Sequence, residues 1–208
     1  MKDKMNMKRI ALIMAALAIL VTGCSKGQKF TLKGDLETAN FKQAPDSLIL
    51  TSDYMPAIHT IRVKDGAFTF SGRLEQPILA TLKAPGERVV SKPLILEKGT
   101  ITFENGHPRG TPLNEAFYGL SQQVREALQA NRENPEAKQE ALFKIFHDYL
   151  AQHSDDPSAI LTIMAAQRYV DPAQMSELVA LTSKSIQNDS HIDRIKLELR
   201  LMGAKTAQ

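Results

Sequence analysis

The clearest structural signal in the chain is the stretch Thr60-Ile61-Arg62-Val63-Lys64-Asp65-Gly66-Ala67-Phe68-Thr69-Phe70. Apolar and polar side chains alternate on both sides of its centre, which is the period of a β-strand with one buried face. The pair Asp65-Gly66 readily adopts the positive φ values that a tight hairpin turn requires. The stretch therefore predicts a β-hairpin whose core face carries Ile61, Val63, Phe68 and Phe70.

Similar segments surround the hairpin, and strands are predicted at residues 30–36, 47–51, 78–82, 93–97 and 100–104. The last two are expected to pair across Lys98-Gly99, with Asn105-Gly106 closing the pair. Gly34 suggests a bulge or bend, and Gly72 is expected to end its strand. Short strands about ten residues apart predict an antiparallel β-sandwich or barrel-like domain of about seven to eight strands over residues 30–110.

After Gly110 the hydrophobic period becomes 3.6, which indicates helices. Four capping residues are each followed by proline, which has no N–H to leave unpaired at the first helical position. These four predicted starts are Thr111-Pro112, Asn134-Pro135, Asp156-Pro157 and Asp171-Pro172. A fifth helix is expected from Ser190, so residues 111–203 should form about five helices, followed by a tail at 204–208. The predicted fold class is α+β, with the apolar helix stripes forming a core rather than a partner groove.

The N-terminus has the plan of a bacterial secretory signal. Four basic residues precede an apolar run of 12 residues, Ile10–Val21, which is too short for a membrane span of about 20 residues. The order Val21-Thr22-Gly23-Cys24 resembles the lipobox of bacterial lipoproteins, in which the cysteine receives diacylglycerol. Residues 1–23 are therefore expected to be a cleaved signal peptide and residues 24–29 a tether. The alternative is an ordinary secretory signal that happens to contain a cysteine.

Lipidation would use the one cysteine of the chain, Cys24. No thiol would then remain for a disulfide, a metal site or a nucleophile. Two or more acyl chains anchor a protein stably, so membrane attachment through lipid is expected. Ser25 favours delivery to the outer membrane, with the domain facing the periplasm. The inner membrane and the cell surface stay open as alternatives.

The net charge of +3 belongs to the leader. Residues 1–23 hold four of the 26 basic and one of the 23 acidic residues, which leaves 22 of each. Nucleic-acid binding normally needs a basic surplus, so that class of partner is set aside. The chain has no tryptophan and 6% aromatic residues, which gives no support to a stacking platform for sugars or bases.

No catalytic residue, cofactor site or metal site can be named from the sequence. There is no glycine-rich phosphate loop and no nucleophile elbow. His153 with Asp155 and Asp156 could form a loose cation site. The simpler interpretation of Asp155-Asp156-Pro157 is a helix cap, with its charge at the positive end of the helix dipole.

Four motif pieces together resemble a known domain: Phe30-x-Leu32-x-Gly34-x-Leu36, Val63-x-Asp65-Gly66-x-Phe68-x-Phe70-x-Gly72, Leu96-Glu97-x-Gly99-x-Ile101 and Gly110-Thr111-Pro112-Leu113-Asn114. It is the β-rich domain of unknown function at the N-terminal half of many envelope lipoproteins of thiol–disulfide oxidoreductase type. The resemblance implies a following helical segment, over about residues 30 to 200 in all. In that family a thioredoxin-like module with Cys-x-x-Cys comes next, and this chain has no such motif.

The favoured function is therefore a lipid-anchored, non-catalytic binding or interaction module of the cell envelope, with a protein or peptide partner. The alternative is an accessory to a separate thioredoxin-like thiol–disulfide oxidoreductase in the periplasm. An enzyme of another class is the weakest hypothesis, because it would need a cleft with convergent polar groups.

Overall fold

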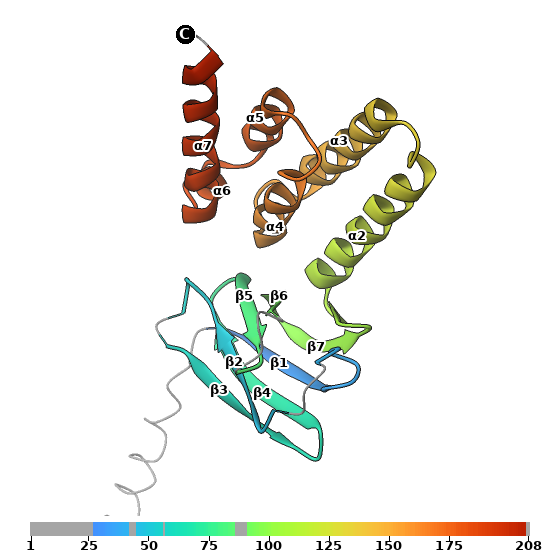
Figure 1. Ribbon diagram of the computed structural model, residues 1–208. Helices are drawn as coiled ribbons and strands as arrows, with labels where there is room; N and C mark the ends of the chain where they lie inside the picture. Colours follow the sequence, from blue (N-terminus) through green and yellow to red (C-terminus); the bar gives the residue numbers. More distant parts are fainter. Residues whose placement is uncertain (1–26, 42–44, 56, 86–90, 207–208) are drawn as a thin grey trace, which may run out of the picture.

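A computed structural model describes residues 27–41, 45–55, 57–85 and 91–206. In these residues an eight-stranded sheet, curled into a nearly closed barrel, is followed by six helices. The helices stand together at one end of the barrel, with α2 nearest to the sheet (Figure 1). The predicted α+β class and the barrel-like domain are confirmed.

The strands are β1 (Gln28–Asp35), β2 (Ser47–Thr51), β3 (His59–Lys64), β4 (Ala67–Leu74), β5 (Ile78–Lys83), β6 (Ser91–Leu96), β7 (Gly99–Glu104) and β8 (His107–Arg109). The helices are α2 (Pro112–Ala130), α3 (Pro135–Gln152), α4 (Pro157–Ala166), α5 (Pro172–Leu181), α6 (Lys184–Gln187) and α7 (Ser190–Thr206). The strand order is β6-β5-β2-β3-β4-β1-β7-β8. Among the described residues no helix is long and apolar enough to cross a bilayer.

The predicted hairpin is present as β3 and β4. Asp65 and Gly66 have φ values of 51° and 77°, as its two-residue turn requires. Ile61 and Phe68 are buried, and Val63 and Phe70 pack against the same barrel core. The prediction of a shared core face is therefore confirmed.

Two predictions about glycines are wrong for the same reason. Gly72 does not end its strand, because β4 continues to Leu74, and Gly34 pairs in a regular register without a bulge. Each glycine makes room for an aromatic ring. A Cβ on Gly72 would lie 2.6 Å from Cε1 of Phe30, and a Cβ on Gly34 would lie 3.0 Å from Cζ of Phe68.

The predicted pairing of the strands on either side of Lys98-Gly99 is also wrong. β6 pairs antiparallel with β5, whereas β7 pairs parallel with β1, Phe30 lying opposite Gly99. The sheet is thus mixed rather than wholly antiparallel. Asn105-Gly106 forms a turn as expected, but it leads into β8, a strand that the sequence pattern did not reveal.

The predicted helix starts are confirmed. Each of the four prolines is the first residue of its helix, and α7 begins at Ser190. The side chains of Asn134, Asp156 and Asp171 accept hydrogen bonds from main-chain N–H groups of the first turn. The short helix α6, capped by Ser183, was not predicted.

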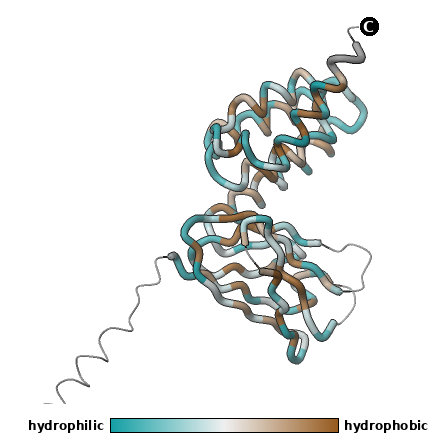
Figure 2. Tube along the Cα trace, turned by 90° about the vertical axis from the view of Figure 1, so that its left-hand side faces the viewer, coloured by the Kyte–Doolittle hydropathy of each residue, from teal (hydrophilic) through white to brown (hydrophobic). Residues whose placement is uncertain are grey.

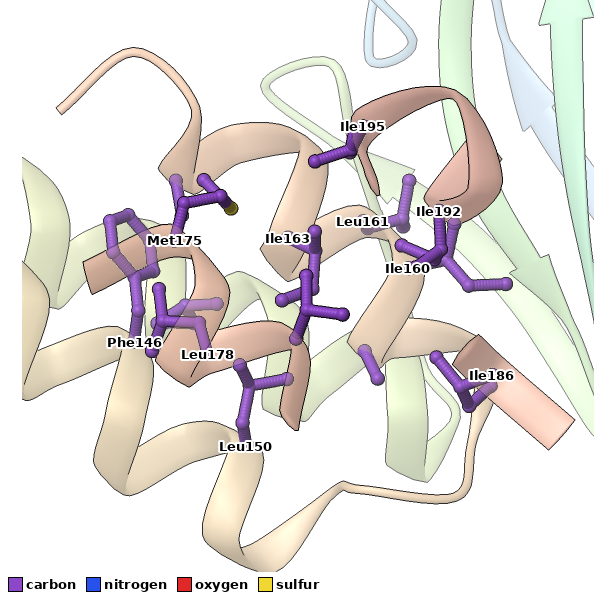
Figure 3. Packing of buried hydrophobic residues seen from close by; sticks show 14 of the residues in the cluster. Phe146, Leu150, Ile160, Leu161, Ile163, Met175, Leu178, Ile186, Ile192 and Ile195 are labelled. Carbon is purple, nitrogen blue, oxygen red and sulfur yellow. The ribbon is translucent and has the colours of Figure 1, made fainter. Parts of the chain in front are cut away.

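Two hydrophobic cores meet at β5 and β6. The barrel interior is one core, and the helical core gathers side chains from α2 to α7. Figure 3 shows those of α3 to α7 pointing toward one another. Leu79 of β5 and Ile95 of β6 belong to the helical core, whereas Ile78 and Leu94 belong to the barrel. These strands are therefore buried on both faces, and hydrophobic segments recur through both parts of the chain in Figure 2.

The hairpin turn gives a test with a matched control. Gly66→Ala should lower the free energy of unfolding by about 1 kcal/mol, because alanine is strained at positive φ. No atom lies within 4 Å of the new Cβ, so the loss reports backbone strain alone. Gly119→Ala, which is equally unobstructed but lies inside α2, should stabilise by about 0.5 kcal/mol. Urea unfolding measures both, and equal signs for the two substitutions would contradict the assignment.

Candidate functional site

The barrel and the helices are joined by a buried carboxylate. Glu97, which follows β6 and is 6% exposed, directs Oε1 to the N-terminus of α2. This oxygen accepts hydrogen bonds from the main-chain N–H groups of Leu113, at 2.9 Å, and Asn114, at 3.2 Å. Thr111 occupies the N-cap position, but its side chain makes no capping hydrogen bond. The cap is therefore supplied from the end of β6, and the predicted role of the Thr111 side chain is wrong.

Asn114 completes the joint from the helix side. Its amide is 2% exposed, accepts from the main-chain N–H of Ile95 at 3.1 Å and donates to the carbonyl of Ile95 at 2.7 Å. The same amide donates to Oγ1 of Thr111 at 2.8 Å. The side chain thus pairs with β6 as a neighbouring strand would. We conclude that the two motif pieces around Glu97 and Asn114 form a structural joint.

A charged cluster lies beside this joint on β8. Arg109 binds Glu104 at 2.7 Å and Glu115 at 2.8 Å, and its guanidinium carbon lies 4.0 Å from the centre of the Tyr118 ring. The hydrogen bond from the Gly110 N–H lowers the pKa of Glu115, and the hydrogen bond and positive charge of Arg109 lower it further. Burial and the nearby cations Lys92, Arg125 and Arg109 lower the pKa of His107. Arg109 is paired with both carboxylates, and the His107 ring lies edge-on to Tyr118 with 5.3 Å between the ring centres, which indicates a structural role.

A cavity of about 880 Å³ opens where β3 and β4 separate. The two strands pair only next to their turn, Val63 with Phe68 and Lys64 with Ala67. The walls are mainly apolar, and His59, Arg73 and Glu75 add polar groups. The lining residues are Phe30, Tyr54, Met55, His59, Phe70, Ser71, Gly72, Arg73, Leu74, Glu75, Gln76 and Ile78. An apolar hollow of this size with a few polar groups is typical of a ligand site.

Tyr54 ties one wall of the cavity to the helices. Its hydroxyl donates a hydrogen bond to the carboxylate of Asp189, which precedes α7. Burial and this carboxylate raise the pKa of Tyr54, so the hydroxyl remains a donor at neutral pH. Asp189 also accepts from the main-chain N–H of His191 at 2.9 Å and faces its ring nitrogen Nδ1 at 3.0 Å. The loop between β2 and β3 is thereby held against the start of α7.

The residues singled out in the sequence lie in different places. Cys24 and the lipobox residues Val21, Thr22 and Gly23 lie outside the described residues. Asp156 caps α4 by accepting from the Ser158 N–H at 2.8 Å, while His153 Nδ1 binds its second oxygen at 2.9 Å. Both groups are thus used in a helix cap. The described ranges contain no group of three or more His, Cys, Asp or Glu residues that could hold a metal ion.

Comparison with known proteins adds one finding. Residues 30–117 match DUF4369, a domain of unknown function. The matched region runs from β1 into α2 and therefore contains both the Glu97 joint and most of the cavity wall. The expected domain of unknown function is confirmed. No curated protein and no solved structure matches the chain.

The joint predicts a graded effect of substitution at Glu97. Glu97→Ala should lower the free energy of unfolding by about 2–3 kcal/mol, because it leaves buried N–H donors of α2 unpaired. Glu97→Gln keeps an acceptor oxygen and should cost about 1 kcal/mol. Urea unfolding followed by circular dichroism measures both losses. A Glu97→Ala protein as stable as the parent would show that the joint does not fix α2 to the barrel.

Proposed function

We propose that this chain is a lipid-anchored binding protein of the cell envelope. Residues 1–23 direct export, Cys24 carries the lipid, and the β domain binds its ligand in the cavity between β3 and β4. The domain faces the periplasm from the outer membrane, as the residue after the cysteine suggests. We expect the cavity to bind a ligand without transforming it, because apolar walls with a few polar groups suit binding.

The anchor and the cavity are close along the chain, which supports a shared role. β1 begins at Gln28, four residues after Cys24. A chain spans at most about 3.5 Å per residue, so the start of the barrel stays within about 14 Å of the anchored residue. Arg73 of the cavity wall donates to the carbonyl of Gly27 at 3.1 Å. The ligand would therefore be held near the membrane surface.

The cavity is the observation that carries the binding role. Its volume lies within the range of about 300–1,000 Å³ that is usual for ligand sites. Its wall includes Tyr54, which contacts Asp189 in the helical part. Occupancy of the cavity could thus be sensed by the helices, as an interaction module requires.

The accessory role beside a thioredoxin-like oxidoreductase is the second candidate. It is favoured by the match of residues 30–117 together with the motif resemblance. In that role the β domain would hold the oxidoreductase or its substrate, and the partner would supply the thiols.

The anchor is tested by Cys24→Ala. This variant should lose metabolic labelling with a palmitate analogue and accumulate with its signal peptide attached, since no thiol is left to acylate. Ser25→Ala is the matched control and should be labelled and processed normally. Labelling and the mobility of the precursor on gels report the result. Normal processing of Cys24→Ala would refute lipid anchoring.

The binding role is tested by capture from detergent-solubilised envelopes with the anchored protein as bait. Leu74→Glu places a charge in the cavity wall and should abolish capture of the partner, because a buried charge opposes an apolar ligand. Gln123→Glu adds the same charge at an exposed position of α2, outside the cavity wall, and should leave capture unchanged. Equal capture by both variants would exclude the cavity. Recovery of a thioredoxin-like protein would favour the second candidate.

A further inference from the structure

The gap between β3 and β4 is a seam with strand edges on both sides. Near the turn the hairpin pairs normally, but beyond Val63 and Phe68 the described chain has no pairing between these strands. In this region β3 pairs with β2, and β4 pairs with β1 along all eight of its residues. One edge of each strand therefore faces the cavity instead of another strand.

The alternation of main-chain groups shows which ones face the seam. In a hairpin with a two-residue turn, the flanking pair Lys64 and Ala67 exchanges main-chain hydrogen bonds, and successive residues then point to opposite sides. The Val63 N–H accordingly donates away from β4, to the Asp46 carbonyl at 2.9 Å. By the same alternation the N–H and C=O groups that face the seam belong to Thr60 and Arg62 of β3 and to Thr69, Ser71 and Arg73 of β4. Val63 and Phe68 form a non-hydrogen-bonded pair, which is held by the bonds on either side of it, so the Thr69 N–H donates to the Arg62 carbonyl. The N–H groups of β4 that this pairing leaves in the seam are those of Ser71 and Arg73.

The cavity lining agrees with this assignment. A strand that presented only its face would line a cavity with every second residue. Five consecutive residues, 70–74 of β4, line this cavity. The edge of β4 itself is therefore part of the wall, and its main chain is within reach of a ligand.

The side chains beside the seam separate into two rows. Inward, the cavity offers the apolar surfaces of Phe30, Phe70 and Ile78. Outward, β1, β3 and β4 carry five exposed cations. The carboxylates near them are Asp35 and Asp65 at the turn end of the hairpin and Glu75 just after β4. The exposed cations are Lys29, Lys33, Arg62, Lys64 and Arg73. A ligand with alternating apolar and acidic groups would complement both rows.

We infer that the seam binds an extended acidic segment of a partner protein as an additional strand. The segment would pair its main chain with the free edge of β4 and place alternate apolar side chains in the cavity. An acyl chain would fill the cavity but leave the main-chain groups of Ser71 and Arg73 without a strand partner, which disfavours a lipid. This inference rests on the proposed function, because it assigns the ligand class of the same cavity.

Hydrogen exchange of the full-length protein in mild detergent tests the inference. The probe is a ten-residue peptide with blocked ends in which valine alternates with glutamate. In the free protein the amides of Ser71 and Arg73 should exchange quickly, and those of Phe70 and Gly72, which face β1, slowly. Saturating peptide should slow the amides of Ser71 and Arg73 at least tenfold. Slow exchange of these two amides in the free protein, or no change with the peptide, would overturn the inference.

Two controls isolate the main-chain contact. Ser71→Pro removes an N–H that faces the seam and no main-chain hydrogen bond to β1, so peptide affinity should fall at least tenfold. It also removes the hydroxyl contact of Ser71 with Thr31 of β1, which the alanine control removes as well. Ser71→Ala keeps this N–H and should bind within twofold of the parent. If Ser71→Pro fails to fold, a peptide in which valine alternates with proline tests the same contact on the parent protein, and tight binding of that peptide would overturn the inference.

A palmitate arm separates this inference from the proposed function. If palmitate binds and the peptide does not displace it, while the amides of Ser71 and Arg73 still exchange quickly, the peptide assignment is overturned and a ligand-binding cavity is retained. Charge is tested by a peptide of valine alternating with lysine, which should bind at least tenfold more weakly than the glutamate peptide. Equal affinity would refute the acidic preference. Lipid labelling at Cys24 is independent of all these outcomes.

Discussion

The arrangement of the two parts depends on the buried carboxylate of Glu97 at the start of α2. An ionised group is costly to bury unless donors surround it. Here the main-chain N–H groups of Leu113 and Asn114 and the positive end of the helix dipole supply that compensation. Asn114 in turn pairs with the main chain of Ile95. Because polar groups of β6 and Glu97 form hydrogen bonds with polar groups of α2, this helix has a fixed position on the barrel.

This fixed position explains the burial of β5 and β6 and the form of the cavity. With α2 held at the end of β6, the helical core can cover the outer faces of Leu79 and Ile95. The same packing brings α7 close enough for Asp189 to bind Tyr54. The loop that carries Tyr54 therefore forms a stable cavity wall, although it lies far from Glu97 along the chain.

Local signals in the sequence predicted the elements that depend on local physics. The Asp65-Gly66 turn and the helices that begin at proline follow from the preferences of a few neighbouring residues. The wrong predictions concern partners distant in sequence. Glycine is a residue that often ends a strand, but Gly72 lies against the ring of Phe30 inside one, and no local pattern reveals that contact. Glu97 was visible in a motif, but its role needs α2 to be in place.

The cavity could not be predicted because it results from a competition between strand pairings. A continued hairpin register would place Thr69 opposite Arg62 and Ser71 opposite Thr60. Instead, β4 keeps its full register with β1, and β3 keeps its register with β2. The rings of His59 and Phe70 then lie 4.9 Å apart at the opening. Sheet closure usually removes exposed edges. Here the turn holds one end of the hairpin closed, and the different partners of β3 and β4 leave a strand edge on each side of the cavity.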